Sequence, residues 1–259
     1  MNRLKPAVIL AAVLLIWHPL PGYAKDWYFK PAVNHRPATT EPEYEKLLKK
    51  YDGIYIGNPN EKTIYLTFDN GYEAGHTGTI LNTLKKEHVP AAFFITGHYI
   101  SDQPKLVQRM VREGHIVGNH SWGHPDLSAI GDARYRQELK KLKDAYTRLT
   151  GKRTMNYLRP PRGTFSERSL RLAEEQGYIS VFWSAAYKDW VRGESHGADY
   201  AYKRIMQRIH PGAIVLLHTV SKDNAEALPR VIADLKKQGY RFCSLDDLMA
   251  QRLLPPTIR

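Results

Sequence analysis

Residues 63–71 read Thr63-Ile64-Tyr65-Leu66-Thr67-Phe68-Asp69-Asn70-Gly71. Residues of high β propensity fill positions 63–68, and an acid, an amide and a glycine follow at once. This pattern predicts a buried strand that ends in a tight turn, because Gly71 adopts backbone conformations that other residues avoid. Asp69 and Asn70 are therefore expected just past a core strand, where Asp69 serves either as a base or only as a cap for backbone amides.

Downstream of this strand, apolar runs of strand length alternate about seven times with longer stretches of helical period, which predicts a parallel sheet in an α/β fold. Upstream, residues 54–56 precede the turn signal Gly57-Asn58-Pro59-Asn60, which predicts a hairpin with residues 63–68. The other expected strands are 91–96, 115–118, 157–159, 179–183, 213–217 and 240–243. The expected helices are 78–87, 104–113, 133–149, 167–176, 199–209, 225–238 and 245–250.

The chain is expected to divide into four segments. Residues 1–24 are expected to be a signal peptide, because a basic start, an apolar run and a Gly22-Tyr23-Ala24 cleavage site follow one another. The apolar run is short for a membrane span, although an uncleaved anchor is an alternative. Residues 25–53 are expected to form an N-terminal arm or tether with a short helix at 41–51, residues 54–254 a single domain, and residues 255–259 a tail.

The composition indicates a basic protein, with 38 Lys and Arg against 26 Asp and Glu and a formal net charge of +12. A basic exported protein is attracted to polyanions such as the carboxylates and phosphates of a cell wall, although a generally soluble surface explains the charge equally well. No dense basic block with interleaved aromatics is present, which argues against nucleic acid as a partner. We expect export to the cell wall, no stable membrane insertion after cleavage, and a monomer.

Polar residues follow several of the expected strands directly. In parallel α/β folds, chemistry takes place at the carboxyl ends of the strands, where the loops converge. The sequence therefore predicts that polar clusters distant along the chain meet at one rim. These residues are Asp69, Asn70, His120, His124, Arg159 to Gly163, Asp189 and His218.

His120 and His124 are four residues apart, a spacing that places two imidazoles on one face of a helical turn. Imidazole is a good ligand for zinc and other late first-row divalent ions. With 11 histidines in the chain, two can also fall at this spacing by chance. The pair alone is therefore only a moderate indication of a metal site.

Five elements, taken together and in order, resemble the motifs of the polysaccharide deacetylases, a carbohydrate esterase family that shares the chitooligosaccharide deacetylase domain. They are Thr67 to Gly71, the His120/His124 pair, Arg159-Pro160-Pro161-Arg162-Gly163, Asp189-Trp190 and Leu216-Leu217-His218. The Asp-Asn-Gly-Tyr form of the first element resembles, more narrowly, the peptidoglycan N-acetylmuramic acid deacetylases of spore-forming bacilli. Those enzymes prepare muramic δ-lactam in the spore cortex.

The resemblance implies a distorted (β/α) barrel of about seven βα units and a metal-assisted hydrolysis of an N-acetyl group. Asp69 would be the general base, oriented by Arg159 through a charge-assisted pair. His218 would protonate the departing amine, with Asp189 favouring the charged form of its imidazole. All four side-chain types fit these roles on their own chemistry.

The resemblance also implies a divalent ion, expected to be zinc, with His120, His124 and Asn70 as its ligands. The family usually has a second Asp where this chain has Asn70, so a neutral carbonyl oxygen replaces an anionic ligand. Weaker metal binding is therefore expected. Glu73 is either a further oxygen ligand or a solvated loop acid.

Arg162 stands where relatives that act on N-acetylglucosamine commonly have an aromatic residue. A guanidinium binds carboxylates through two parallel hydrogen bonds, and a lactyl carboxylate distinguishes N-acetylmuramic acid from N-acetylglucosamine. Arg162 is therefore a candidate for binding that carboxylate, with a surface Arg that has no ligand as the alternative. Trp190 and Tyr72 adjoin catalytic motifs and are expected to lie near the sugar groove.

The sequence thus predicts an exported, metal-assisted deacetylase of N-acetylmuramic acid in peptidoglycan, active in forming cortex δ-lactam and located at the wall or in the forespore intermembrane space. Deacetylation of N-acetylglucosamine in peptidoglycan or chitin-type oligomers is the close alternative. A non-catalytic protein that binds wall glycan is an alternative of another class. The presence of both a base and an acid argues against it, because glycan binding alone requires neither.

Overall fold

The computed structural model describes residues 23–33, 36–191 and 193–253. Of the predicted signal peptide, residues 1–24, only the last two are described, and the predicted tail, residues 255–259, lies outside the described residues. Within the described ranges, no helix combines the length and the apolar character that a membrane crossing requires.

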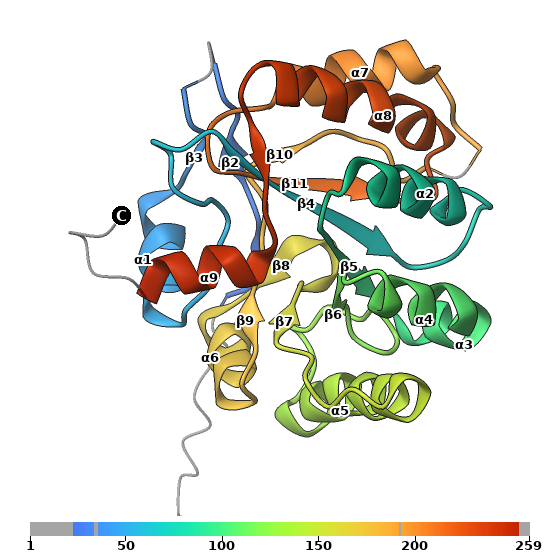
Figure 1. Ribbon diagram of the computed structural model, residues 1–259. Helices are drawn as coiled ribbons and strands as arrows, with labels where there is room; N and C mark the ends of the chain where they lie inside the picture. The colour runs from blue at the N-terminus through green and yellow to red at the C-terminus, as the bar shows by residue number, and fades with distance from the viewer. Residues whose placement is uncertain (1–22, 34–35, 192, 254–259) are drawn as a thin grey trace, which may run out of the picture.

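A curled parallel sheet forms the centre of the molecule, and helices cover its outer face (Figure 1). Seven strands follow one another in the order β10-β11-β4-β5-β6-β7-β9, and β12 also pairs with β4. The predicted distorted (β/α) barrel is confirmed as this curled half-barrel sheet. The strands are β4 (Thr63–Asn70), β5 (Ala91–Ile95), β6 (Ile116–Asn119), β7 (Tyr157–Leu158), β9 (Ile179–Ser180), β10 (Ala185–Ala186), β11 (Ala213–His218) and β12 (Arg241–Phe242).

Residues 54–56 connect two strands that lie far apart in the order of the sheet. Ile54 forms a parallel bridge with Val181, and Ile56 forms an antiparallel bridge with Ala213. The predicted hairpin between residues 54–56 and 63–68 is therefore wrong. The reason is that both edges of β4 are already occupied, by β11 on one side and by β5 and β12 on the other.

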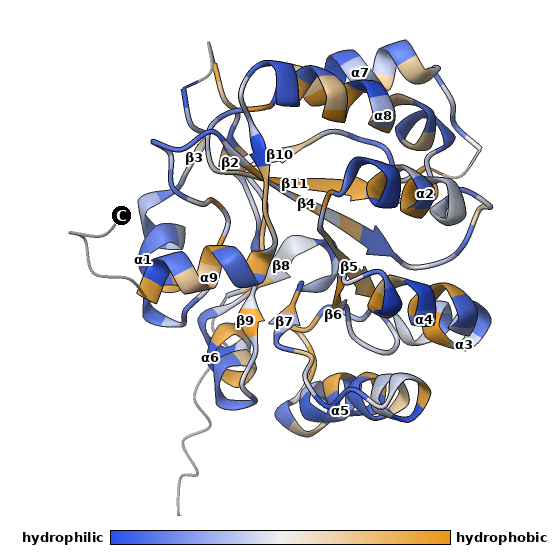
Figure 2. Ribbon diagram, viewed as in Figure 1, coloured by the Kyte–Doolittle hydropathy of each residue, from blue (hydrophilic) through white to orange (hydrophobic). Residues whose placement is uncertain are grey.

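Amphipathic helices pack their apolar faces on the sheet and turn their polar faces to solvent, as the colouring in Figure 2 shows. Local signals fix their ends: Ser166 and Ser169 form a capping box at the start of α6, and Gly151 ends α5 with φ 73°. The helices are α1 (Pro42–Lys50), α2 (Thr77–Glu87), α3 (Gly97–Asp102), α4 (Pro104–Arg112), α5 (Asp132–Thr150), α6 (Glu167–Glu175), α7 (Ala198–Met206), α8 (Lys222–Lys237) and α9 (Leu245–Leu253).

The alternation of side chains along β4 determines what faces the inside of the curled sheet. Ile64, Leu66 and Phe68 belong to the main core beneath the helices, whereas Tyr65 belongs to a separate interior cluster with Phe94. Successive side chains of a strand point to opposite faces. Thr67 and Asp69 therefore share the inner face with Tyr65, which places the carboxylate at the carboxyl end of the half-barrel.

The N-terminal arm is packed against the domain and is not a loose tether. Its strands are β1 (Lys25–Asp26), which pairs with β8 (Thr164–Phe165), and β2 (Phe29–Lys30), which pairs with β3 (Thr39–Thr40). Trp27 is buried in a third apolar cluster with Phe165 and Phe182. Burial of large aromatic rings of this kind contributes about 1.5–3 kcal/mol per side chain, which adds to the strand pairing that holds the arm against the domain.

Candidate active site

A cleft of about 870 Å³ opens at the carboxyl ends of the strands. The predicted site residues that line it are Asp69, Tyr72, His120, His124, Arg162, Trp190 and His218. Arg159 lies behind this surface and is completely buried, and the side chain of Asp189 is only 1% exposed. The structure therefore brings together residues from five separate segments of the chain, as the rim argument predicted.

Asp69 and Arg159 form a buried ion pair at the floor of the cleft. Nη1 of Arg159 donates to Oδ1 of Asp69 at 2.8 Å, and Nη2 donates to the Thr67 hydroxyl, also at 2.8 Å. Nε donates to the Val181 carbonyl at 3.1 Å, and the guanidinium lies 4.2 Å from the centre of the Phe94 ring. Three hydrogen-bond partners and one aromatic ring thus fix the position of the guanidinium.

This ion pair determines the charge of Asp69. Burial alone would raise the pKa of Asp69, but the adjacent Arg159, together with His120 and His218, holds the pKa below its usual range. Oδ2 of Asp69 faces Nε2 of His120 at 3.5 Å, a distance too long for a strong hydrogen bond. Asp69 is therefore ionised at neutral pH and has one oxygen able to accept a proton.

His120 and His124 lie in a loop and not on a helical turn, so the helical prediction for this pair is wrong. Ser121 and His124 have φ values of 63° and 56°, which a helix excludes. Side chains replace the helical hydrogen bonds: the Ser121 amide donates to Oδ1 of Asn119 at 2.9 Å, and the His124 amide donates to Oγ of Ser121 at 2.9 Å. The two imidazoles nevertheless meet, with ring centres 4.8 Å apart.

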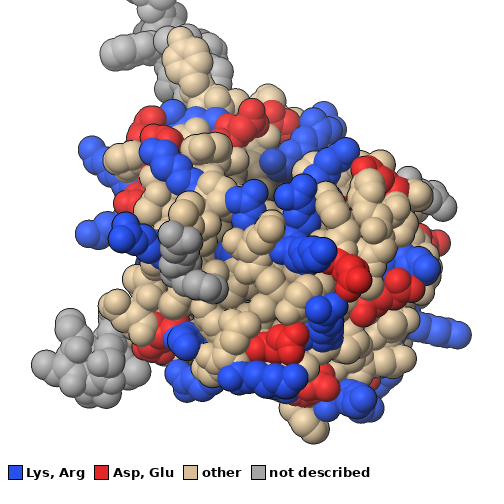
Figure 3. Space-filling view, turned by 90° about the horizontal axis from the view of Figure 1, so that it is seen from above, with Lys and Arg blue, Asp and Glu red and all other residues tan. Residues whose placement is uncertain are grey.

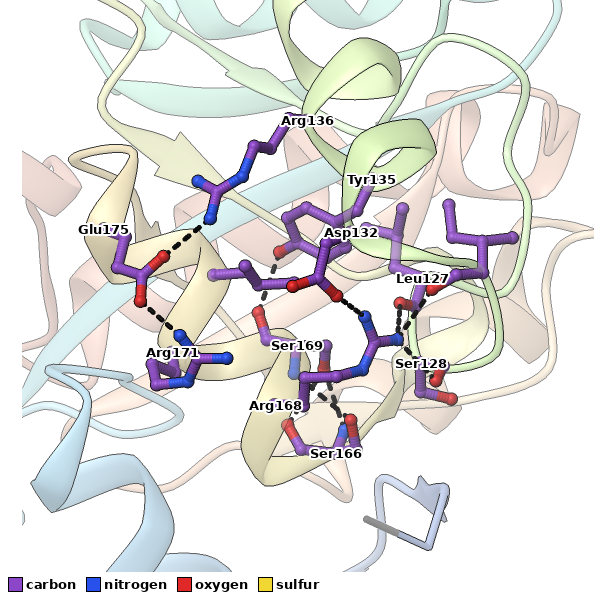
Figure 4. Close-up of polar contacts among 12 residues, drawn as sticks. Leu127, Ser128, Asp132, Tyr135, Arg136, Ser166, Arg168, Ser169, Arg171 and Glu175 are labelled. Atoms are coloured by element: carbon purple, nitrogen blue, oxygen red, sulfur yellow. Dashed lines mark hydrogen bonds and ion pairs between the residues drawn. The ribbon is translucent and has the colours of Figure 1, made fainter. Parts of the chain in front are cut away.

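Arg168 of α6 binds the C-terminal part of the loop that contains both histidines, residues 120–131 (Figure 4). Nη2 of Arg168 donates to the carbonyl oxygens of Ser128 and Ile130 at 2.9 and 2.7 Å, and Nη1 pairs with Asp132 at 2.6 Å. The loop therefore has a fixed end four residues beyond His124, although it contains no regular secondary structure.

His218 and Asp189 form the second charged pair of the cleft. Oδ1 of Asp189 lies 2.7 Å from Nδ1 of His218, and Oδ2 accepts the His218 backbone amide at 2.8 Å. Burial alone would lower the pKa of His218, but the Asp189 carboxylate raises it above the usual value. Because Nδ1 donates to Asp189, Nε2 is the atom that can give a proton to a group in the cleft.

No pattern in the sequence indicated one partner of this pair, Asn224 of α8. Its Nδ2 donates to Oδ2 of Asp189 at 2.5 Å, and its Oδ1 accepts the Tyr187 hydroxyl. Asn224 is 1% exposed, so it forms part of the packed wall behind the site. A helical Asn becomes recognisable as a site residue only when the fold brings it to the acid.

Asn70 is buried on the opposite face of β4 from Asp69 and does not line the cleft. Its Nδ2 donates to the Thr219 hydroxyl at 2.7 Å. The sequence interpretation ended the strand at Phe68, but β4 continues to Asn70, so the alternation of the strand separates the two neighbours. A metal-ligating role for Asn70 stays a prediction, although its Oδ1, the atom that would bind an ion, has no hydrogen-bond partner among the described residues.

Glu73 is neither a solvated loop acid nor a residue that lines the cleft. One carboxylate oxygen accepts the Gly75 and Thr77 amides at 2.7 and 3.2 Å, and the other accepts the hydroxyls of Thr77 and Tyr99 at 2.5 and 2.9 Å. Glu73 therefore caps the start of α2. Its acceptor capacity is already used within the protein.

Aromatic rings form much of the cleft wall. Tyr72 and Trp190 line the cleft, as predicted, and the Trp190 ring centre lies 5.7 Å from that of His218. Trp122 and Trp183 also line it, although their positions in the sequence did not single them out from core aromatics. Flat apolar walls of this kind suit the faces of sugar rings.

The chemistry of the two imidazoles fits a divalent ion. Nδ1 of His120 lies 2.8 Å from the Arg159 carbonyl, to which it can only donate, so Nε2 carries the lone pair. Burial lowers the pKa of His120, and burial together with His120 lowers the pKa of His124 to about 4, so both rings are neutral. Among the described residues, however, no three His, Cys, Asp or Glu side chains form a cluster that could hold a metal. The protein therefore offers two imidazole ligands rather than a closed cage.

Comparison with known proteins agrees with this geometry. Residues 56–181 match the family model for polysaccharide deacetylase. An uncharacterized 30.6 kDa protein of Geobacillus stearothermophilus is 54% identical over 91% of this chain and 87% of its own length. The peptidoglycan-N-acetylmuramic acid deacetylase PdaA of Bacillus subtilis is 50% identical over 95% of this chain and 94% of its own.

Two further comparisons are with a solved structure and with a less similar relative. The structure of Bacillus subtilis PdaA, a family 4 carbohydrate esterase, superposes with a TM-score of 0.88 at 51% identity, covering 90% of this chain and 100% of that one. A peptidoglycan-N-acetylglucosamine deacetylase of Bacillus cereus is 33% identical over 78% of this chain and 73% of its own. The chain therefore belongs to the polysaccharide deacetylases, family 4 of the carbohydrate esterases, and is a hydrolase.

Proposed function

We propose that this hydrolase removes the acetyl group from N-acetylmuramic acid residues of peptidoglycan. The observation that carries the proposal is the cleft itself, which is lined by Asp69, whose pKa is lowered, by His218, whose pKa is raised, and by Arg162. The similarity to a relative named for N-acetylmuramic acid also supports it, because the relative named for N-acetylglucosamine is less similar, at 33% against 50% identity.

The two charged pairs divide the proton transfers of amide hydrolysis between them. Asp69 accepts a proton from the water that attacks the acetyl carbonyl, while Arg159 keeps the carboxylate oriented. His218 gives a proton to the sugar nitrogen as the carbon–nitrogen bond breaks, so acetate and a free amine leave. Asp189 stabilises the imidazolium until that proton has moved.

Deacetylases of this family are generally metal-dependent. Held by His120 and His124, a divalent ion, zinc in our proposal, would supply polarisation of the acetyl carbonyl and a more acidic water. The two neutral imidazoles support this assignment. Asn70 is the third ligand in our proposal, and its replacement of an acid is the reason we propose a loosely held ion.

The rate of deacetylation is expected to fall as the pH rises through the raised pKa of His218, because the acid must be protonated. The charged groups that act on its imidazole are Asp189, Asp69 and Arg159. Asp189→Asn removes the carboxylate that raises the pKa, so the alkaline limb of the pH–kcat profile should move to lower pH and the maximal rate should fall about 10²-fold. An alkaline limb in the same place would show that another group is the acid.

Arg162→Ala is expected to lower kcat/KM for N-acetylmuramic acid about 10- to 100-fold, because a charge-assisted bidentate contact with the lactyl carboxylate is lost. The rate on N-acetylglucosamine oligomers should change less than about twofold, since these sugars have no such carboxylate. Arg162→Lys keeps the charge without the planar fork and serves as the matched variant. Unchanged activity and sugar preference in Arg162→Ala would remove this assignment.

A digest of peptidoglycan incubated with the purified protein decides among the three proposed functions. Mass spectrometry of the products should show loss of acetyl from muramic acid. Loss from glucosamine would favour the alternative deacetylase, and loss from neither sugar would favour a wall-binding protein without activity. Binding to intact peptidoglycan, measured in parallel, separates an inactive preparation from one that has not folded.

We further propose that the protein acts outside the membrane, on the wall, as a monomer, and in spore-cortex δ-lactam synthesis within the forespore intermembrane space. The basic start and apolar run of residues 1–24 support export. On the face seen in Figure 3, Lys and Arg side chains are interspersed with Asp and Glu, and the net positive charge of the chain supports attraction to the anionic groups of a wall. Detection of the protein in purified forespore integument or in cytoplasm would test the location.

A further inference from the structure

The N-terminal arm contacts the turn that carries Arg162. β1 pairs antiparallel with β8, with Lys25 opposite Phe165 and Asp26 opposite Thr164. The pairing continues one residue further, because the Trp27 amide donates to the Gly163 carbonyl at 3.0 Å. The arm is therefore bonded to the residue directly after Arg162.

The indole of Trp27 contacts the segment that packs against this turn. Its Nε1 donates to the Trp183 carbonyl at 3.0 Å, and its ring centre lies 4.5 Å from that of Phe182. Trp183 lines the cleft together with Arg162 and Gly163. One buried side chain of the arm thus joins the Arg162 turn to the wall of the cleft.

The Arg162 turn needs such support because its backbone is unfavourable. Arg162 has φ 60°, in the left-handed region that a side chain with a Cβ rarely adopts. A Cβ added at Gly163 would lie 2.8 Å from the Trp183 ring and 3.0 Å from Cβ of Trp27. Gly163 therefore lies in close contact with both tryptophans, which leaves no space for a side chain at this position of the turn.

We propose that Trp27 is a positioning residue that holds the Arg162 guanidinium in place for the carboxylate of an acidic amino sugar. This inference rests on the proposed role of Arg162. Trp27 touches no substrate and acts through the turn. The arm, which lies outside the residues matched by the family model, then belongs to the substrate site and contributes to its preference for an acidic sugar.

The test combines kinetics with hydrogen exchange. Trp27→Ala is expected to lower kcat/KM on peptide-free glycan strands containing N-acetylmuramic acid about tenfold or more, because small misplacements of a binding group have large effects on rate. In an Arg162→Ala background the same substitution should have no further effect. Trp27→Phe keeps an aromatic ring but not the indole N–H, so its kcat/KM should lie between those of the wild type and Trp27→Ala. Tyr28→Ala, on an exposed residue of the same arm, should have the kcat/KM of the wild type.

Hydrogen exchange separates local positioning from general unfolding. In Trp27→Ala, the amides of residues 162–165 should exchange at least about tenfold faster while those of β5 are unchanged. Unchanged exchange in the turn, or an equal loss of activity in both Arg162 backgrounds, would overturn the proposal. If Arg162→Ala alone does not change sugar preference while exchange still rises in Trp27→Ala, the carboxylate assignment fails and the positioning of the turn by Trp27 stands.

Discussion

Asp69→Asn is expected to lower kcat at least about 10³-fold while the protein still binds its glycan. Asn keeps the size of the side chain and an oxygen that can accept from Nη1 of Arg159, but it cannot take a proton from water at neutral pH. In the wild type, burial would raise the pKa of Asp69, yet Arg159, together with His120 and His218, keeps it low, so the carboxylate is ionised at neutral pH and can act as the base. Release of acetate from peptide-free glycan measures the rate, and co-sedimentation with intact peptidoglycan measures binding.

Asp102→Asn is a matched control for this substitution, because it removes an exposed carboxylate outside the cleft. It should leave both kcat and binding unchanged. Circular dichroism of Asp69→Asn must show a folded protein, since Arg159 loses its counter-charge. Retention of more than about a tenth of the wild-type kcat in a folded Asp69→Asn would place the general base elsewhere.

The central strands and helices could be predicted because their signals are local. β5 is a continuous apolar run, as expected for a strand covered on both faces, and α5 and α6 have clear ends. The arm and residues 54–56 could not be predicted, because partners distant in the sequence determine their conformations. Trp27 packs against Phe182, and Ile54 bridges Val181, and neither pairing has a periodicity of its own.

The sequence could predict which residues of the candidate site lie close together, but not how their side chains are arranged. The rim rule placed Asp69, His120 and His218 together, since the carboxyl ends of parallel strands share one edge. The face of β4 on which the Asn70 side chain lies depends on the strand continuing two residues past Phe68. Propensity scales do not locate strand ends to within two residues. The contribution of Asn224 depended on the packing of α8, which a helical pattern does not reveal.

Arg159→Leu is expected to lower the free energy of unfolding by about 3–5 kcal/mol, because it leaves the buried Asp69 carboxylate without its cation. For a domain of this size, the loss corresponds to a fall in Tm of roughly 6–20 °C. Arg159 is 0% exposed, so water cannot take over the role of its guanidinium. Scanning calorimetry of the purified variant measures the change, and kcat should fall with it, because Asp69 is no longer oriented.

Acidification should reduce this loss of stability. In the wild type, Asp69 has a depressed pKa, so its contribution is present above the unfolded value of about 4 and is lost only as the pH falls below it. Without Arg159, burial dominates and raises the pKa, so the penalty is full only above that raised pKa and disappears below about 4. The difference in Tm between the variant and the wild type should therefore narrow from about pH 8 to about pH 4.

The double variant Asp69→Leu/Arg159→Leu separates charge from packing. It removes both ions together, so it should be inactive but closer to the wild type in Tm than Arg159→Leu is, because no buried charge is left unpaired. A double variant as unstable as Arg159→Leu would instead attribute the loss to the guanidinium's packing over Phe94 and its hydrogen bonds to Thr67 and Val181. In that case Arg159 would stabilise the half-barrel interior mainly as a packed and hydrogen-bonded side chain, and only secondarily as the counter-ion of the base.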